Sequence, residues 1–230
     1  INAHDLRSAP LFDSWAATLR EAGIRRVSGR LIGDDHAFDD EPLGAGWAWD
    51  YLAASYAAPS GALSYNENLV AIRIKPGAEA GAAASFEISP TGHDLSIESH
   101  VTTVNPGEAA TITIDRLPGS SVVRVRGRVP AGAPALVRAT TIENPTRYFV
   151  EALRLALESR AIRIDNGAWD IDDLPVEAAR NAPARRVIAS HESLPLSSLV
   201  AQMMKTSQNF YAEMLLKAVG RTHASAEGVG

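Results

Sequence analysis

The segment from residue 69 to residue 141 constrains the fold of this chain more than any other feature. Six short stretches of β-branched and apolar residues follow one another there, and turns such as Pro76-Gly77 and Pro118-Gly119 separate them. Short strands without helices between them predict a small antiparallel sheet or sandwich rather than a parallel α/β sheet. The predicted strands are residues 69–75, 85–89, 95–103, 110–117, 122–129 and 135–141.

Helix-then-strand units flank this all-β block on both sides. Residues 11–22 have apolar residues at helical spacing, and residues 25–33 alternate as a strand. Beyond the block, Asn144-Pro145 predict the cap and first turn of a helix, which a short strand at residues 162–164 follows. The simplest account is one α/β domain interrupted by an all-β insertion.

The C-terminal part of the chain predicts two consecutive helices. They cover residues 195–205 and residues 210–219, with Gly220 ending the second, and a short strand at residues 187–190 precedes them. A polar break at residues 206–209 separates the two helices.

Composition and charge exclude several classes of protein. The formal net charge is −5, and Lys and Arg are scattered rather than clustered, which argues against a nucleic-acid partner. There is no apolar run of about 18 residues, so we predict no transmembrane segment. The absence of cysteine excludes disulfides and cysteine-ligated metals and is compatible with export from the cytoplasm. Both ends of the chain look interrupted.

The polar break contains a pattern that is typical of a known catalytic motif. Ser207-Gln208-Asn209 fits the S-x-N pattern of the penicillin-recognising serine enzymes, whose other motifs are S-x-x-K and K-T-G. Taken by itself, the tripeptide favours a plainer interpretation, in which Ser207 and Asn209 cap a helix. The sequence around it changes that balance.

Residues 193–216, which include this tripeptide, resemble the D-alanyl-D-alanine carboxypeptidase/endopeptidases, the class C penicillin-binding proteins. The likeness continues in residues 23–35, 46–50, 58–63 and 66–68 and in residues 143–145 with the helix after them, and it is thinnest in the all-β block. The resemblance implies a multi-domain α+β architecture, in which two accessory domains interrupt a penicillin-binding, β-lactamase-like serine peptidase fold. The implied domains are a split accessory α/β domain (residues 1–64 and 142–186), an inserted all-β domain (65–141) and a helical fragment of the peptidase domain (187–230).

Two of the family's three catalytic motifs are missing from the chain. No Lys follows a Ser by three positions, the helical spacing that places a base beside a nucleophile. Lys205-Thr206-Ser207 is not K-T-G, because Ser stands where Gly would let the substrate backbone approach. The nucleophilic Ser and its Lys therefore lie outside these residues, and we predict that the chain is inactive alone.

The resemblance also implies roles for the residues of the S-x-N motif. Ser207 would join the proton-transfer network beside the nucleophile, and Asn209 would hydrogen-bond the substrate's peptide carbonyl. Gln208 stands at the middle position, where Asp is often found.

A second candidate site is the W-x-x-D pattern of Trp47 and Asp50. The resemblance implies that it helps to recognise the free end of a peptidoglycan stem peptide, since a carboxylate can bind an ammonium group while an indole covers its aliphatic stem. The alternative is structural: Trp47 and Trp49 pack in a core, and Asp50 caps a helix that starts near Tyr51.

The acidic stretch at residues 34–41 suggests a metal site, since hard cations prefer clustered carboxylates. Its spacing does not match a calcium-binding loop, and we interpret it as a solvated acidic turn. We predict neither a metal nor an organic cofactor.

Two functions follow from the sequence. In the first, the intact protein is a periplasmic or otherwise extracytoplasmic serine peptidase that cleaves peptidoglycan stem peptides through an acyl-enzyme and is inhibited by β-lactam antibiotics. In the second, it is a non-enzymatic module that binds peptidoglycan or an envelope protein and retains a vestigial peptidase fold. Upstream S-x-x-K and downstream K-T-G motifs would favour the enzyme.

Overall fold

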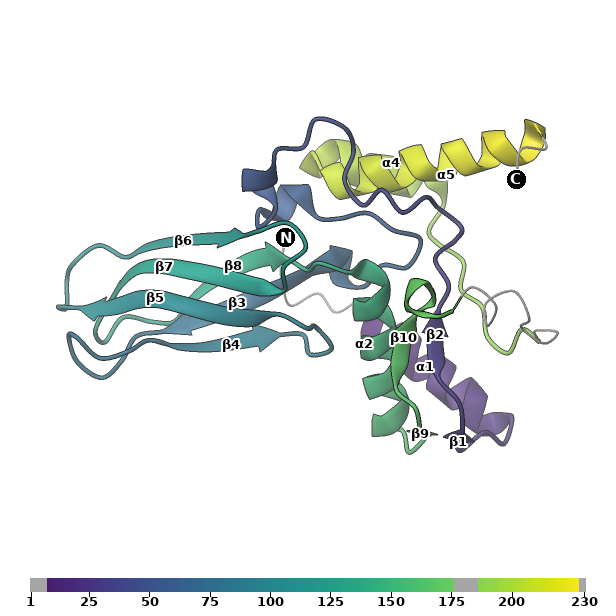
Figure 1. Ribbon diagram of the computed structural model, residues 1–230, viewed down its shortest axis with the longest axis horizontal. Coiled ribbons are helices and arrows are strands. Elements are labelled where there is room, and N and C mark those ends of the chain that lie inside the picture. Colours follow the sequence, from purple (N-terminus) through teal and green to yellow (C-terminus); the bar gives the residue numbers. More distant parts are fainter. Residues whose placement is uncertain (1–7, 176–185, 228–230) are drawn as a thin grey trace.

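The computed structural model describes residues 8–175 and 186–227 and shows a mixed α+β protein (Figure 1). A block of long strands lies at one end, two packed helices with short strands lie beside it, and a pair of helices crosses above them. Within the described residues, no helix combines the length and the apolarity needed to cross a membrane.

All six predicted strands are present in the β block. β3 (Leu69–Lys75), β4 (Ser85–Ser89) and β8 (Leu136–Thr141) form one antiparallel sheet in the order β4-β3-β8. β5 (Ser96–Val104), β6 (Thr111–Arg116) and β7 (Val122–Pro130) form the other, in the order β5-β7-β6. Inward-facing aliphatic residues of both sheets, such as Ile72 and Val125, share one core.

The expectation of purely antiparallel pairing in this block is wrong for one pair of strands. β6 and β7 form an antiparallel hairpin, but β5 pairs with β7 in parallel. The reason is topological: β7 inserts between β5 and β6, so the strand that pairs with β5 is not the next one along the chain.

The segments that precede and follow the β block in the sequence pair with each other. β1 (Arg26–Val27) pairs in parallel with β9 (Arg163–Ile164), and β2 (Leu31–Gly33) pairs in parallel with β10 (Ala168–Asp170). The predicted single strand at residues 25–33 is therefore wrong, since a turn breaks it into β1 and β2.

Two helices cover these short strands. α1 (Ser8–Glu21) packs on α2 (Pro145–Ser159), and Ala16, Leu157 and Ile162 are buried between the helices and the strands. The predicted cap of α2 is confirmed, because the Asn144 side chain accepts a hydrogen bond from the backbone N–H of Arg147.

The C-terminal helices are α4 (Leu196–Thr206) and α5 (Asn209–Glu227). The predicted end of α5 at Gly220 is wrong, because one glycine costs only about 1 kcal/mol in a helix interior and does not stop it. The predicted strand at residues 187–190 is also wrong. Val187 is 82% exposed, and no strand of the described residues pairs with this segment.

Candidate functional site

The S-x-N tripeptide lies at the junction of α4 and α5. Ser207 is the C-cap of α4 and adopts a left-handed conformation with φ 52°, which turns the chain sharply before α5 begins. Its side chain is exposed. The plainer interpretation required the side chain of Ser207 or Asn209 to cap a helix. Among the described residues neither side chain forms such a bond, and the Asn209 amide donates to a residue outside its own helix.

Gln208 and Asn209 hold the junction against a segment more than 140 residues earlier in the chain. The amide of Gln208 donates to the Glu67 carboxylate over 2.7 Å (Nε2 to Oε2), and the amide of Asn209 donates to the backbone carbonyl of Tyr56 over 3.1 Å. The next residue, Phe210, is buried against Ala58 and Leu69. Hydrogen bonds and apolar contact therefore seat the start of α5 on residues 56–69.

The turn that presents Glu67 has an unusual backbone. Asn66, Glu67 and Asn68 form the short helical turn η3 (Asn66–Asn68), and all three have positive φ, from 50° to 56°. Asn tolerates this region, but for Glu it costs about 1–2 kcal/mol. Asn68 is fully buried, and its side chain donates to the Pro59 carbonyl over 2.8 Å.

Trp47 also lies next to this junction. Its ring stacks on Tyr56 with centroids 6.2 Å apart, and its indole N–H donates to Glu213 of α5 over 3.3 Å. Tyr56 is thus a shared neighbour of Trp47 and Asn209, which sequence reasoning did not identify. Tyr56 as a whole residue is 49% exposed.

Asp50 lies in a short helical turn, η1 (Trp49–Tyr51), on the exposed surface. The turn joins the same aromatic group, because the ring of Tyr51 meets the ring of Tyr56 edge to face, with centroids 5.7 Å apart. The structural alternative for this pattern is wrong in two respects. Trp49 is 66% exposed rather than packed in a core, and Asp50 makes no capping hydrogen bond.

A lysine fixes the middle of α5 to the acidic stretch. Lys217 donates to the Asp39 carboxylate and, over 2.8 Å, to the Glu41 carbonyl. The Lys217 ammonium group holds the pKa of Asp39 below its usual value. The Asp39 side chain is 65% exposed, as expected for a solvated acidic turn, and its carboxylate also anchors α5.

Asp35, in the same acidic stretch, lies close to two carboxylates that follow the β block in the sequence. Oxygen atoms of Asp35, Asp170 and Asp172 lie within 4.8 Å of one another. Thr146 donates to one oxygen of Asp35, but the other is buried and has no hydrogen-bond partner among the described residues. Burial, together with the nearby charges of Asp170 and Asp172, raises the pKa of Asp35.

We expect Asp35→Asn to stabilise the protein at neutral pH. A carboxyl whose folded pKa is raised destabilises the fold above that pKa and costs nothing below its unfolded pKa near 4. The substitution should raise the Tm by about 1–3 °C at pH 7.5, and the difference should vanish at pH 4. Thermal unfolding at both pH values measures it. A fall in the wild-type Tm on adding EDTA would contradict this account, since it would show that a cation offsets the repulsion.

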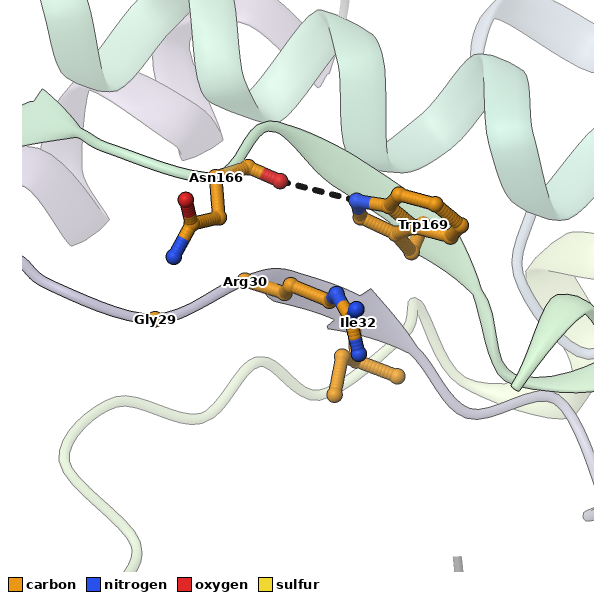
Figure 2. A pocket seen from close by; sticks show the side chains of 5 residues that line it. All are labelled: Gly29, Arg30, Ile32, Asn166 and Trp169. Carbon is orange, nitrogen blue, oxygen red and sulfur yellow. Dashed lines mark hydrogen bonds between the residues drawn. The ribbon is translucent and has the colours of Figure 1, made fainter. Parts of the chain in front are cut away.

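An open hollow of about 530 Å³ lies on the strand face opposite α2 (Figure 2). The Arg30 guanidinium sits 4.7 Å from the centroid of the Trp169 ring, whose indole N–H donates to the Asn166 carbonyl over 2.8 Å. Gly29 and Ile32 complete the lining. None of these five lining residues, all within the described part of the chain, has a hydroxyl, carboxylate, imidazole or ammonium group, so they offer no group for nucleophilic or acid–base catalysis.

Comparison with known proteins matches residues 3–229 to the family model described as the D-Ala-D-Ala carboxypeptidase 3 (S13) family. The chain is 29% identical over 225 residues to a D-alanyl-D-alanine carboxypeptidase of Actinomadura sp. (strain R39), covering 95% of this chain and 41% of that protein. It is 24% identical to D-alanyl-D-alanine carboxypeptidase DacB of Haemophilus influenzae, covering 94% of this chain and 43% of the relative.

Its fold is similar to the crystal structure of penicillin binding protein 4 (dacB) from Haemophilus influenzae, with a TM-score of 0.75 and 20% identity. That match covers 92% of this chain and 45% of the solved chain. A second structure of the same protein, in complex with a β-lactam, matches with a TM-score of 0.61, 20% identity, and coverage of 92% of this chain and 43% of that one. The chain thus spans less than half the length of each of these relatives.

Proposed function

Because the chain belongs to the D-Ala-D-Ala carboxypeptidase 3 (S13) family, we propose that it is part of a serine-type D-alanyl-D-alanine carboxypeptidase/endopeptidase. The whole protein acts on peptidoglycan stem peptides through an acyl-enzyme, and β-lactam antibiotics inhibit it by acylating the same serine. It works in the periplasm or another extracytoplasmic compartment, where its substrate is found.

The observation that best supports this proposal is the arrangement of the S-x-N loop. Ser207 is exposed at the sharp turn between two helices, while the side chains of Gln208 and Asn209 anchor the loop to Glu67 and Tyr56. In the proposed mechanism the Ser207 hydroxyl relays a proton beside the nucleophile. One N–H of Asn209 is bound to Tyr56, and its other N–H and its carbonyl oxygen are the groups that pair with the substrate amide.

The proposal assigns different tasks to different parts of the chain. Residues 1–64 and 142–186 form the split accessory α/β domain, residues 65–141 form the inserted β domain, and residues 187–230 belong to the peptidase domain. Large apolar residues on α4 and α5 are exposed, which fits helices whose packing partner belongs to the remainder of the protein. These residues are Leu196, Val200, Met204, Leu216 and Val219.

Trp47 and Asp50 are the proposed recognition site for the stem peptide. Asp50 is exposed, and Trp47, Tyr51 and Tyr56 form a continuous aromatic group beside it. A carboxylate next to exposed rings suits a side chain that combines an ammonium group with an aliphatic stem.

Labelling with a fluorescent penicillin tests the proposed function. The full-length protein should be acylated at a serine in an S-x-x-K motif, and prior treatment with unlabelled penicillin should block the label. The 230-residue chain alone should remain unlabelled, because it contains neither S-x-x-K nor K-T-G. A full-length protein that neither takes the label nor hydrolyses a D-alanyl-D-alanine peptide would support the non-enzymatic binding module instead.

A further inference from the structure

We propose that Glu67 is a positioning residue, which sets the conformation of the S-x-N loop by holding the side chain of Gln208. This inference rests on the proposed function, since it assigns a purpose to a contact of the same site. Glu67 lies 141 positions before Gln208, at the start of the proposed inserted β domain, and its carboxylate accepts a hydrogen bond from the Gln208 amide over 2.7 Å.

Gln208 is well placed to control its two neighbours. Gln208 lies between Ser207 and Asn209 in the sequence, and the residue is only 9% exposed. Its backbone N–H donates to the Met203 carbonyl of α4, and its own carbonyl accepts from the Ala212 N–H of α5. The backbone of Gln208 thus bonds to both helices, and holding its side chain restrains the junction at which Ser207 and Asn209 lie.

The turn that holds Glu67 is rigid. Asn66 donates to the Leu69 carbonyl over 2.7 Å, and Asn68 accepts from the Tyr65 N–H over 3.2 Å while it also donates to Pro59. These bonds leave the turn little freedom to follow a moving loop. Glu67 therefore holds the Gln208 side chain in one position and does not move with it.

The backbone of Glu67 indicates that its side chain has a function. A residue at φ 54° with a long side chain is strained, and glycine would be more stable at this position. The carboxylate offsets part of this strain by accepting a hydrogen bond from the buried Gln208 amide. The backbone at residue 67 therefore favours glycine, whereas the contact with Gln208 requires a carboxylate. Variants at residue 67 can separate the effect on stability from the effect on positioning.

The first test exchanges the two partners in the full-length protein. Gln208→Glu places two carboxylates in contact and should slow acylation by a fluorescent penicillin about tenfold or more. Glu67→Gln retains an acceptor oxygen and should acylate at close to the wild-type rate. The double variant Glu67→Gln/Gln208→Glu restores a donor and an acceptor in reversed order, and it should recover most of the lost rate.

The second test separates positioning from folding. Glu67→Gly relieves the left-handed strain but removes the acceptor of the Gln208 amide, and the two effects on stability are of similar size, so its Tm should stay close to that of the wild type while acylation slows about tenfold. If the role of Glu67 were purely structural, the Tm of this variant would fall and its acylation rate would be unchanged. Glu87→Ala is the matched control: Glu87 is an exposed glutamate on β4, paired with Lys75, and its loss should leave acylation unchanged.

The outcomes distinguish the two proposals. If wild-type protein is not acylated at all, the proposed function fails. If wild-type protein is acylated and both Gln208→Glu and Glu67→Gly acylate at its rate, the positioning role of Glu67 is wrong and the proposed function stands. If Gln208→Glu is slow but the double variant is equally slow, the contact does not act as a pair, and the inference is also wrong.

Discussion

Replacing Asn209 by alanine in the full-length protein is expected to lower kcat/KM for a D-alanyl-D-alanine peptide by about 100- to 1,000-fold. The expected size follows from other enzymes, in which removing one preorganised hydrogen-bond donor of the active site has an effect of this order. The Asn209 side chain is preorganised here because one of its N–H groups is bound to the Tyr56 carbonyl. Steady-state hydrolysis of a stem-peptide substrate measures the effect.

The fold should survive this substitution. Asn209 is partly exposed, and losing its hydrogen bond to Tyr56 should cost only about 1 kcal/mol of stability. Asn105→Ala is a suitable control, because Asn105 lies in the exposed turn after β5 and bonds only locally with Glu108. A kcat/KM for Asn209→Ala within about threefold of the wild type would remove this residue from the mechanism.

Replacing Gly127 by alanine is expected to destabilise the β block by about 3 kcal/mol or more. Gly127 lies in the middle of β7, the central strand of its sheet, with φ 133°. An added Cβ would stand 1.8 Å from the Thr111 carbonyl oxygen of β6, so the two strands would have to separate. The added Cβ is bonded directly to the backbone of β7, and the carbonyl oxygen belongs to the backbone of the paired strand β6. Rotation of a side chain therefore cannot relieve the clash.

Gly81→Ala separates the steric effect from the backbone effect. Gly81 also has positive φ, at 87°, but an added Cβ there meets no atom within 4 Å. We expect it to cost about 1 kcal/mol, the strain of φ alone. Urea unfolding followed by circular dichroism compares the two variants. Equal losses would show that the contact with Thr111 does not matter.

Local sequence was sufficient for the elements of the β block. Turns such as Pro76-Gly77 and Pro118-Gly119 limit the strands on both sides, and alternation specifies which residues face inward, so the predicted and observed strands differ by at most a residue at each end. The cap at Asn144 was predictable for the same reason, because its donor is only three residues away. The predictions were wrong at residues 28–30, where Ser28-Gly29 interrupts the predicted strand, and at residues 187–190, which pair with no strand of the described residues.

The order and direction of the strands depended on distant partners. The parallel pairing of β5 with β7 joins strands that another strand separates in sequence, and β1 and β2 find their partners more than 130 residues later. Periodicity describes which face of a strand is apolar, but it contains no information about which strand lies beside it.

For the candidate site, the sequence by itself determined the types of residue: an S-x-N tripeptide between two helices, and a W-x-x-D pattern far upstream. Only the tertiary structure placed Trp47 and Asn209 around Tyr56, and only it joined Glu67 to Gln208. The physical reason is that a hydrogen bond or a ring contact depends on distances of a few ångströms between side chains. The packing of α5 on residues 56–69 sets those distances, and the spacing of the residues along the chain does not.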